Sequence, residues 1–340
     1  MHSLKNFKYI LIGFGKMGER YLNLLSKDGV KDILVIEKKK ERIDLLKSKF
    51  NISPNKIFKK LDHISFQNDK KIIAIIAATA DNRINLIKKL SNLKIKYIFC
   101  EKPVARSIKE ALDIKKLCKN KKINLSINHP WRFSNQTNKI NKLVKNKNMG
   151  KLISYNFTGA NVGIAMVGIH FIEAFINLTK SKIIKIYGNL KKNKFINARG
   201  KNFEDYNGYI LGENNKKQII IINTSELAGY GCFIIYTYQN GIIVQDFIEG
   251  KISISMRKKI YKNQPTYKYA LPHNNFQIQL KNSDVEEITK IALKKFITKK
   301  NFITIEEALE PLKVVICSIQ SSKLQKEIKI NKTIKNLKYK

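Results

Sequence analysis

Cysteine and long apolar runs are both scarce in this sequence of 340 residues. The four cysteines lie far apart, with no C-x-x-C pair and no histidine at metal-ligand spacing, which argues against a disulfide framework and a zinc site. No uninterrupted apolar run approaches the roughly 20 residues of a membrane span, and the N-terminal segment lacks the pattern of a signal peptide. We therefore expect a cytoplasmic protein that holds no metal and binds no membrane.

Acidic residues and arginine are scarce as well. The chain has 66 basic and 26 acidic residues, a net charge of +40, yet only seven of the basic residues are arginines. Proteins that bind nucleic acid rely on arginine, whose planar guanidinium forms paired hydrogen bonds to phosphate and guanine. Lysine is instead spread along the whole chain among isoleucine and asparagine. The charge therefore indicates a compositional bias and no nucleic-acid partner, although a positive field also draws anionic ligands towards a cleft.

The first residues predict a strand, a glycine-rich loop and a helix. The apolar run Lys8–Ile12 ends at the sequence G-F-G-K-M-G, which fits the G-x-G-x-x-G pattern of dinucleotide-binding loops. In that pattern the first glycine permits a tight turn, the second lets a pyrophosphate approach the backbone, and the third lets helix and strand pack closely. The cofactor-binding residues predicted here are Gly13, Phe14, Gly15, Lys16, Met17 and Gly18.

An acidic residue, Glu37, follows the second predicted strand, Ile33–Ile36. A carboxylate at this position accepts hydrogen bonds from the adenosine ribose and repels a 2′-phosphate, which favours NAD over NADP as the cofactor. Three lysines, Lys38–Lys40, follow immediately and would attract the same phosphate. NADP therefore stays open as the alternative cofactor.

Strands and helices alternate up to about residue 130. The apolar strand Lys71–Ala77 is typical of a parallel sheet that is buried on both faces, and further strands are predicted at Tyr97–Cys100 and Asn124–Asn128. This order predicts a doubly wound Rossmann domain over residues 1–130. Because such sheets bind ligands at the carboxyl ends of their strands, the cofactor is also expected to contact Ala78, Thr79, Asn82 and Glu101.

The pattern changes after about residue 150. Strands are predicted at Gly150–Phe157 and Ile183–Leu190, and the shorter strands that follow are joined by turns. A helix is predicted around His170, and a capping box at Thr304 is predicted to begin the last helix. We therefore expect an α/β protein whose second domain, residues 131–340, is an α+β domain built on a mainly antiparallel sheet.

Five motifs together resemble the glucose-fructose oxidoreductase and inositol 2-dehydrogenase family, known as Gfo/Idh/MocA. They are the glycine loop, Glu101-Lys102-Pro103 after a Rossmann strand, Trp131-Arg132-Phe133, the helix with His170 and Glu173, and the terminal helix that begins T-I-E-E-A. The resemblance covers nearly the whole chain. It implies a Rossmann domain that binds NAD or NADP, an open-faced antiparallel sheet on the substrate side, a sugar-type substrate, and a homodimer or homotetramer built through that sheet.

The resemblance implies that Lys102 and His170 are catalytic. Lys102 lies at a strand end, where its ammonium would contact the cofactor and bind the reacting oxygen. His170 is the better proton carrier, because its unperturbed pKa of about 6.5 lies near working pH. Glu173 lies three residues further along, on the same helix face, where family members usually carry aspartate.

Met166 departs from the family pattern, because many members carry aspartate four residues before the histidine. Methionine offers only a weak acceptor to a substrate hydroxyl. Lys102 and His170 would still suffice for the transfer if the substrate were held differently, with Asn161 supplying a polar contact. The other interpretation is that catalysis is lost and the chain is a cofactor-binding sensor. The residues expected to contact substrate are Lys102, Trp131, Asn161, Met166, His170 and Glu173.

Trp131, the single tryptophan, and Arg132 follow the last Rossmann strand and are predicted to contact the cofactor as well. Trp131 would stack on a sugar face or pack at the domain junction, and Arg132 would hold an anionic group or a backbone carbonyl. The sequence therefore predicts an NAD(P)-dependent oxidoreductase that transfers a hydride to or from a hydroxyl or keto carbon of a sugar or sugar derivative. A nucleotide-linked sugar of surface-glycan synthesis is one candidate.

Overall fold

The computed structural model describes residues 4–64, 71–147, 149–194, 203–265, 271, 273–282 and 284–330 of the chain. These residues divide into two compact units. The first contains the chain up to Pro130 together with Asp284–Leu309, and the second contains the chain from Trp131 to residue 282 and from Glu310 onward. Each unit is built on a sheet of its own.

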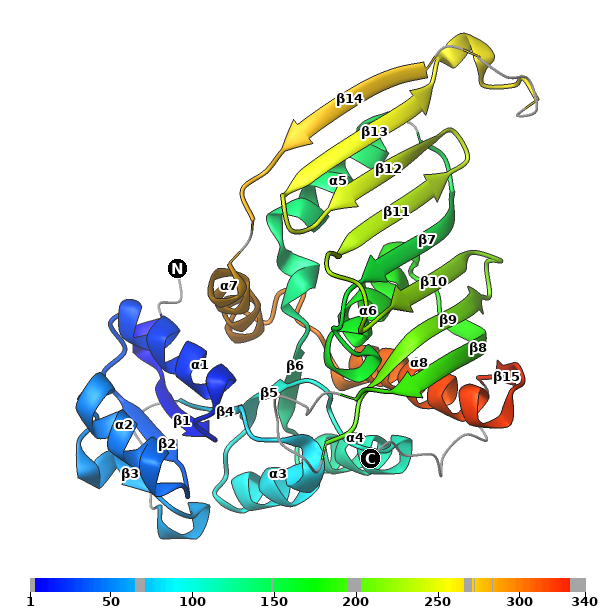
Figure 1. Cartoon of the computed structure of the whole chain (residues 1–340). Helices are drawn as coiled ribbons and strands as arrows, with labels where there is room; N and C mark the ends of the chain where they lie inside the picture. Colours follow the sequence, from blue (N-terminus) through cyan, green and yellow to red (C-terminus); the bar gives the residue numbers. More distant parts are fainter. Residues whose placement is uncertain are drawn as a thin grey trace. The chain divides into compact units, whose positions relative to one another are not determined.

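The first unit is built on a six-stranded parallel sheet in the order β3-β2-β1-β4-β5-β6 (Figure 1). Its strands are β1 (Lys8–Ile12), β2 (Ile33–Ile36), β3 (Ile57–Phe58), β4 (Ile72–Ile76), β5 (Tyr97–Glu101) and β6 (Asn124–Asn128). Its helices are α1 (Lys16–Lys27), α2 (Lys40–Phe50), α3 (Arg83–Asn92), α4 (Ile108–Asn120) and α7 (Val285–Ile297). The strand order reverses between β1 and β4, which is where open α/β sheets bind their ligands.

Residues 284–309, which the sequence analysis grouped with the second domain, pack in the first unit instead. Helix α7 lies beside α1 and β6. Its Phe296 packs against Phe99 of β5 with ring centroids 5.8 Å apart, and the backbone N–H of Ile127 donates to the carbonyl of Ile303 over 3.0 Å. The chain returns to the first unit because the apolar face of α7 needs a buried partner, and the β5–β6 edge of the parallel sheet supplies it.

The second unit is built on a nine-stranded sheet in the order β14-β13-β12-β11-β7-β10-β9-β8-β15. Its strands are β7 (Leu152–Gly159), β8 (Ile183–Lys192), β9 (Tyr206–Asn214), β10 (Ile219–Thr224), β11 (Phe233–Tyr238), β12 (Gly241–Asp246), β13 (Lys251–Arg257), β14 (His273–Gln279) and β15 (Ile328–Lys329). Neighbouring strands run antiparallel except for the β7–β10 pair, which is parallel. The predicted fold class, a Rossmann domain with an α+β domain on a mainly antiparallel sheet, is confirmed.

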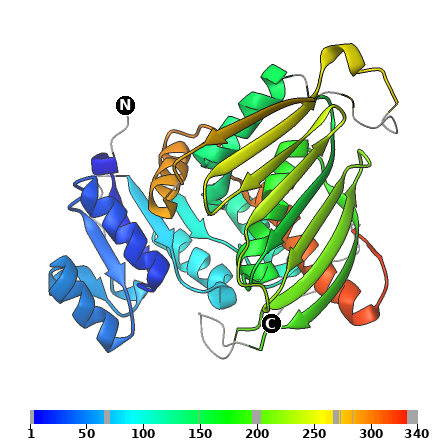
Figure 2. The ribbon, with the colours of Figure 1, turned by 45° about the horizontal axis from the view of Figure 1, so that its top comes forward.

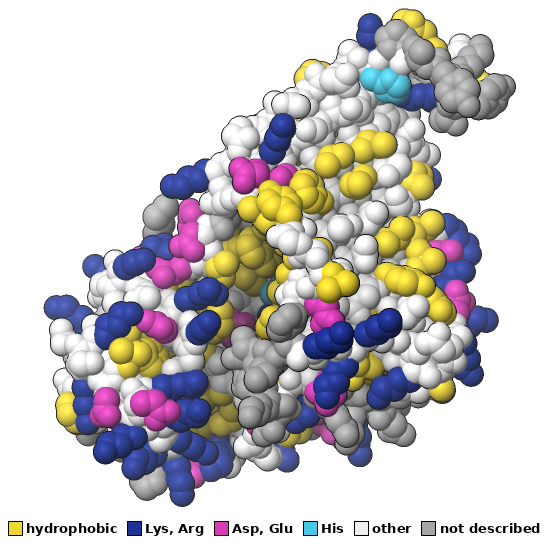
Figure 3. All heavy atoms as spheres, in the orientation of Figure 1, with side chains coloured by type: hydrophobic (Ala, Val, Ile, Leu, Met, Phe, Trp, Pro, Cys, Tyr) yellow, Lys and Arg dark blue, Asp and Glu magenta, His cyan; other side chains and the backbone are white. Residues whose placement is uncertain are grey.

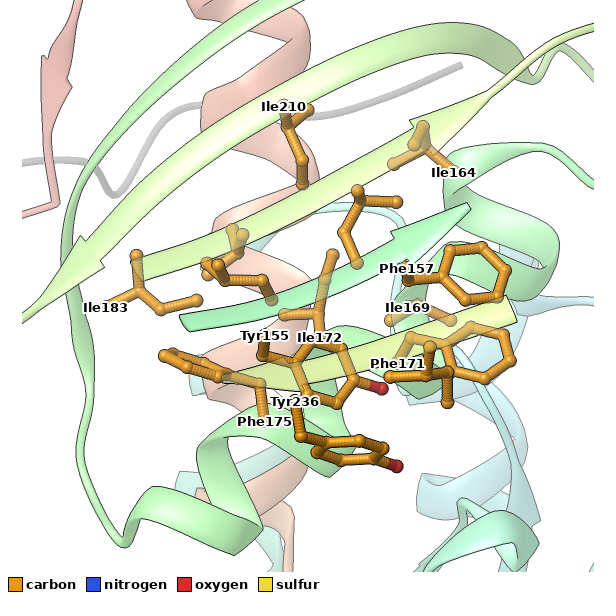
Figure 4. Packing of buried hydrophobic residues seen from close by; sticks show 14 of the residues in the cluster. Tyr155, Phe157, Ile164, Ile169, Phe171, Ile172, Phe175, Ile183, Ile210 and Tyr236 are labelled. Atoms are coloured by element: carbon orange, nitrogen blue, oxygen red, sulfur yellow. The ribbon is translucent and has the colours of Figure 1, made fainter. Parts of the chain in front are cut away.

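Helices cover one face of this second sheet (Figures 1 and 2). They are α5 (Asn135–Lys147), α6 (Ile169–Thr179) and α8 (Ile305–Leu324). The core between α6 and the sheet is rich in aromatic rings (Figure 4). Phe157 of β7 stacks on Phe171 of α6 with centroids 3.8 Å apart, and Tyr155 lies 5.9 Å from Phe175. These contacts fix α6, which carries His170, against the centre of the sheet.

The opposite face of the second sheet carries large apolar side chains that are accessible to solvent. Tyr209, Leu211, Ile235, Ile242 and Phe276 are each between 37% and 47% exposed. Figure 3 shows hydrophobic side chains gathered over these strands. Alternate residues of the same strands, such as Ile210 and Ile234, are buried on the helical side, as the period-2 geometry of strands requires.

Candidate cofactor site and catalytic residues

Two glycines of the predicted loop are required by the packing of the loop itself. Gly13 has a φ of +89°, and a Cβ there would lie 2.8 Å from the backbone nitrogen of Ala78 after β4. A Cβ on Gly18 in α1 would lie 2.2 Å from the carbonyl oxygen of Gly13. These are the tight turn and the close approach of helix and strand that the motif predicts.

Gly15 meets no such requirement among the residues that the structure describes. Its φ of −89° suits any residue, and among the described residues the atoms nearest to a Cβ there would be those of the Arg42 guanidinium, at 3.7–3.9 Å, which is ordinary van der Waals contact. The space beside the Gly15 backbone is therefore open on the protein side. Gly15 also precedes the first turn of α1, where no side chain caps the helix. A pyrophosphate binds to free backbone N–H groups at the start of a helix. Because the backbone at Gly15 is open and no side chain caps the start of α1, these residues fit a dinucleotide.

The other predicted cofactor residues of the glycine loop are Phe14, Lys16 and Met17, which adjoin Gly15 in the chain. Phe14 is buried and packs edge-on against Phe50, with centroids 5.5 Å apart. Lys16, the first residue of α1, is exposed, and the sulfur of Met17 accepts a hydrogen bond from Arg20.

Glu37 lies directly beside the glycine loop, at the end of β2. Its Oε2 accepts the backbone N–H of Phe14 at 2.7 Å, and its Oε1 accepts those of Lys38 and Lys39 at 2.8 and 3.0 Å. Arg42 approaches Oε2 to 3.5 Å. Burial raises the pKa of this carboxyl, but the three hydrogen bonds and the Arg42 charge outweigh burial and lower the pKa below 4.5. The carboxylate is therefore held ionised and in a fixed orientation.

Arg83, a buried residue that the sequence analysis did not single out, stabilises the turn that carries Lys102. Only 1% of its surface is exposed. Its guanidinium donates to the carbonyl oxygens of Glu101 and Pro103, on either side of Lys102, and to that of Ala78 at 2.7 Å. Arg83 thereby joins the ends of β4 and β5. Lys102 itself is buried, and the Lys102–Pro103 peptide bond is cis.

Three further residues predicted to contact cofactor lie at the same strand ends. Glu101 is buried, and its Oε1 accepts hydrogen bonds from the hydroxyl of Tyr21 at 2.6 Å and from Asn128 at 2.7 Å. Burial and the Glu101 charge together raise the pKa of Tyr21, which keeps that hydroxyl a donor. Thr79 precedes a short 3₁₀ turn, and Asn82 precedes α3 and accepts a hydrogen bond from the side chain of Asn85.

In the second unit, the structure joins two residues to which the sequence analysis gave separate roles. Arg132, predicted to contact cofactor, donates from Nε to Oε1 of Glu173 at 2.8 Å and also from Nη2. Glu173, predicted to contact substrate, is 1% exposed. The two residues therefore form a buried ion pair between the segment before α5 and helix α6. His170, one turn before Glu173, is also buried.

The segment that leads into α6 depends on Asp205, which no sequence pattern had indicated. Its carboxylate accepts the backbone N–H groups of Ala165 at 2.9 Å and Met166 at 2.8 Å. Those residues belong to a π-helical turn, Ile164–Gly168, directly before His170. A Cβ on Gly163 would lie 2.1 Å from the same carboxylate. Asp205 therefore sets the conformation of the turn on which Met166 lies.

Asn161, proposed as a polar substitute for the residue missing at Met166, is exposed. Its Oδ1 accepts a hydrogen bond from Asn207 at 2.7 Å, and Asn207 in turn accepts the N–H of Gly163. The Met166 side chain is half-buried. The polar group bound to the Met166 backbone is thus Asp205, while Asn161 pairs with Asn207.

Trp131 packs within the second unit. Its ring meets that of Phe247 edge-on, with centroids 4.8 Å apart. It lines a small pocket of about 20 Å³, enough for one or two water molecules, between α5, α6 and the sheet. Tyr155 lines the same pocket, and its buried hydroxyl has no hydrogen-bond partner among the residues that the structure describes.

The described residues contain no group of three histidine, cysteine or acidic side chains that could hold a metal ion. Within the same ranges, no helix combines the length and apolar character that crossing a bilayer requires.

Residues 7–129 match the sequence model of a family described as "Oxidoreductase family, NAD-binding Rossmann fold". No curated protein sequence matches the chain. The match identifies the first unit as an NAD-binding Rossmann domain, in agreement with the predicted cofactor.

Solved structures are similar to this chain over nearly its whole length. An oxidoreductase from Agrobacterium radiobacter in complex with NAD+, L-tartaric acid and magnesium is 14% identical, with a TM-score of 0.74 over 96% of this chain and 98% of that one. The myo-inositol 2-dehydrogenase of Lactobacillus plantarum is 15% identical, with a TM-score of 0.70 over 95% and 99%. The transcriptional regulator Gal80p of Kluyveromyces lactis is 11% identical, with a TM-score of 0.73 over 98% and 96%. At these identities the similarity establishes the fold.

Proposed function

Because the chain belongs to the Gfo/Idh/MocA family of oxidoreductases, we propose that it transfers a hydride between NAD(H) and a hydroxyl or keto carbon of a sugar or sugar derivative. The observation that carries the proposal is the open backbone at Gly15, where the described residues leave room for a side chain and where a pyrophosphate would fit. Myo-inositol 2-dehydrogenase has the same fold, which supports a polyhydroxylated substrate.

The bound nicotinamide accepts or supplies the hydride. In the oxidation direction, the substrate hydroxyl loses its proton as the hydride leaves the carbon. Lys102 is proposed to donate a hydrogen bond to the reacting oxygen and to stabilise its developing negative charge. His170 is proposed to take up the proton, and to return it when a keto group is reduced. Arg83 and Asp205 are proposed to position the two segments that carry these side chains.

A single methyl group tests the cofactor site. Gly15→Ala has ordinary backbone geometry and room on the protein side, so the free energy of unfolding should stay within about 0.5 kcal/mol of wild type. The methyl group would occupy the position of the pyrophosphate, so NADH should bind about 10-fold more weakly or worse. Titration with NADH fluorescence and urea unfolding measure the two effects. Equal NADH affinity in Gly15→Ala and wild type would contradict the proposed site.

The substrate class is tested with a panel. Purified protein with NAD+ is incubated with inositols, free sugars, sugar acids and nucleotide-linked sugars, and NADH formation is followed by its absorbance. Turnover of any compound in the panel supports the proposal and identifies the substrate class. Nucleotide-linked sugars are one of the compound types tested.

A second candidate function is a sensor that binds the cofactor without turnover. The observation that favours it is Met166, which cannot replace the carboxylate expected from the family pattern, and the fold is shared with the transcriptional regulator Gal80p. NADH binding without turnover across the whole panel would support the sensor, and turnover of one sugar would exclude it.

The exposed apolar face of the second sheet is proposed to join copies of this chain into a homodimer or homotetramer. Leu211 and Ile242 lie on that face and are 47% and 42% exposed. Leu211→Lys with Ile242→Lys should shift the protein to a monomer, as measured by light scattering or sedimentation. A wild-type monomer would contradict this part of the proposal.

A further inference from the structure

Strand β14 forms an edge of the second sheet that the described residues leave open. It pairs with β13 along one side, and no other strand of the described residues pairs with it (Figure 1). The other sheet edges are protected: β3 and β15 are two residues long, and the outward N–H of Ile127 in β6 donates to the carbonyl of Ile303. Strand β14 has seven residues, of which five are exposed. A long open edge is a template for a further strand.

The hydrogen-bond pattern shows which backbone groups of β14 face away from the sheet. Leu280, directly after the strand, donates its N–H to the carbonyl of Gly250 over 2.9 Å and continues the β13–β14 register. In an antiparallel pair, residues that exchange hydrogen bonds alternate with residues that do not. The backbone groups of Asn274, Phe276 and Ile278 therefore face β13. The outward N–H and C=O groups are those of His273, Asn275, Gln277 and Gln279.

The same edge lacks the side chains that usually keep strands of separate chains from pairing. Charged side chains, above all lysine, and proline protect most edge strands, and 66 of the 340 residues of this chain are lysine or arginine. The segment His273–Gln279, H-N-N-F-Q-I-Q, contains no lysine, arginine, aspartate, glutamate or proline. Two chains with a net charge of +40 repel each other, but this segment adds nothing to that repulsion.

We propose that β14 pairs with β14 of a second copy of this chain, antiparallel and centred on Phe276. In that register Asn275 lies opposite Gln277 of the second copy, so that outward N–H groups face outward carbonyls and the two amide side chains meet on one face. Phe276 lies opposite its own copy. A second copy fits this edge because the register matches itself from end to end and neither strand brings a charge. Such a contact is isologous and closes after two copies.

This edge contact is separate from the apolar face that is proposed above to join copies of the chain. It consists of backbone hydrogen bonds, whereas Leu211 and Ile242 belong to the apolar face. One pair of such strands buries less area than the roughly 1,200 Å² of a stable interface, so the edge contact alone is weak and reversible. It is also independent of the proposed oxidoreductase function, which the NADH titration and the substrate panel test.

Cysteine cross-linking of the full-length chain tests the pairing and its register. Cys232, the half-buried cysteine, is first replaced by serine, and the other three cysteines are buried. Phe276→Cys should then give a disulfide-linked dimer under mild oxidation. Residues that face each other without exchanging hydrogen bonds have Cα atoms about 4.5 Å apart, a distance that a disulfide spans. Gel electrophoresis without reductant and mass spectrometry identify the product.

Asn274→Cys is the matched control, because Asn274 lies on the same side of β14 as Phe276. In the proposed register its own copy is four residues away along the paired strand, roughly 13 Å, which is too far for a disulfide. Asn274→Cys should therefore not cross-link with itself, but it should cross-link when mixed with Ile278→Cys. Equal cross-linking of Phe276→Cys and Asn274→Cys, or no cross-link with Phe276→Cys, would overturn the proposal.

A second set of variants changes the edge at Gln277 in the Phe276→Cys chain. Gln277→Pro removes an outward N–H and leaves the hydrogen bonds to β13 in place, and Gln277→Lys places like charges near each other across the contact. Both should abolish the cross-link, whereas Gln277→Thr should keep it. Cross-linking that survives Gln277→Pro and Gln277→Lys would overturn the proposal. Circular dichroism checks that the variants are folded.

Discussion

The two units position their candidate residues by different means. In the first unit, the glycine loop spans six residues, and Glu101-Lys102-Pro103 is contiguous. In the second unit, Arg132 reaches Glu173 across 41 residues, and Asp205 binds the backbone of Met166 across 39. A local motif determines its own geometry once its strand and helix form, whereas the second arrangement exists only in the completed fold. Substitutions of these long-range partners, Glu173 and Asp205 among them, should therefore disturb the stability of the second unit as well as its candidate site.

The largest effect is expected from Glu173→Ala. Arg132 would remain buried without its carboxylate, and breaking a buried ion pair by removing one partner costs about 3–5 kcal/mol. We expect that loss in the free energy of unfolding, as measured with urea, with NADH affinity nearly unchanged because the glycine loop lies in the other unit.

The double variant Arg132→Met with Glu173→Met is the control. With both charges replaced by apolar side chains of comparable length, most of the lost stability should return. If Glu173→Ala were as stable as wild type, the ion pair would not organise this unit.

His170→Ala is expected to have the next largest effect, this time on catalysis. Loss of a general acid–base lowers turnover by roughly 100-fold or more, about 2.7 kcal/mol in the barrier. NADH binding should be retained, because His170 belongs to the unit without the dinucleotide loop. Unchanged turnover on a substrate found with the panel would remove His170 from the mechanism.

The difference between the units also explains how much the sequence could predict. The strand Asn124–Asn128, the capping box between Thr304 and Glu307 and the positive φ at Gly13 all follow from residues that are close in sequence, and all three are observed. Residue type and spacing predict features that are formed by residues close in sequence, so a single sequence is enough to predict these three.

Long-range partners were not predictable in the same way. Periodicity indicates that the face of α7 is buried, but not that it packs on β5 of the first sheet. Asp205 precedes a strand and has no local signature for binding the N–H groups of Ala165 and Met166. Strand β14, with the sequence H-N-N-F-Q-I-Q, has too few apolar residues to be recognised. One signal was available for Arg42 and Arg83: arginine is rare here, seven of 66 basic residues, and both follow Rossmann strands.

Substitutions of Arg83 test whether residues that are distant in sequence also position the candidate residues of the first unit. It joins Ala78 to the turn around Lys102 through buried hydrogen bonds. Arg83→Met should leave those carbonyls unsatisfied and cost about 2 kcal/mol in the free energy of unfolding. Turnover should fall further than this loss of stability explains, at nearly constant KM, because Lys102 would lose its fixed position.

Arg83→Lys separates the two roles. The ammonium keeps the charge but cannot reach three carbonyls with a planar fork, so stability should recover more than turnover. If stability and turnover recovered equally, Arg83 would be purely structural. The local motifs alone would then position the candidate residues of the first unit.

The smallest effect is expected from Glu37, whose partners are mostly neighbouring backbone groups. Its pKa is lower in the folded chain than the ordinary value of 4.5, so folding favours the ionised form. The stability that the carboxylate contributes is therefore fully present above pH 4.5 and is lost as the pH falls below that value. Urea unfolding of wild type and Glu37→Gln should differ most at neutral pH and converge in acid. Glu41→Gln, an exposed neighbour, is the matched control. A difference between wild type and Glu37→Gln that did not change with pH would show that the Glu37 charge plays no part in holding the glycine loop.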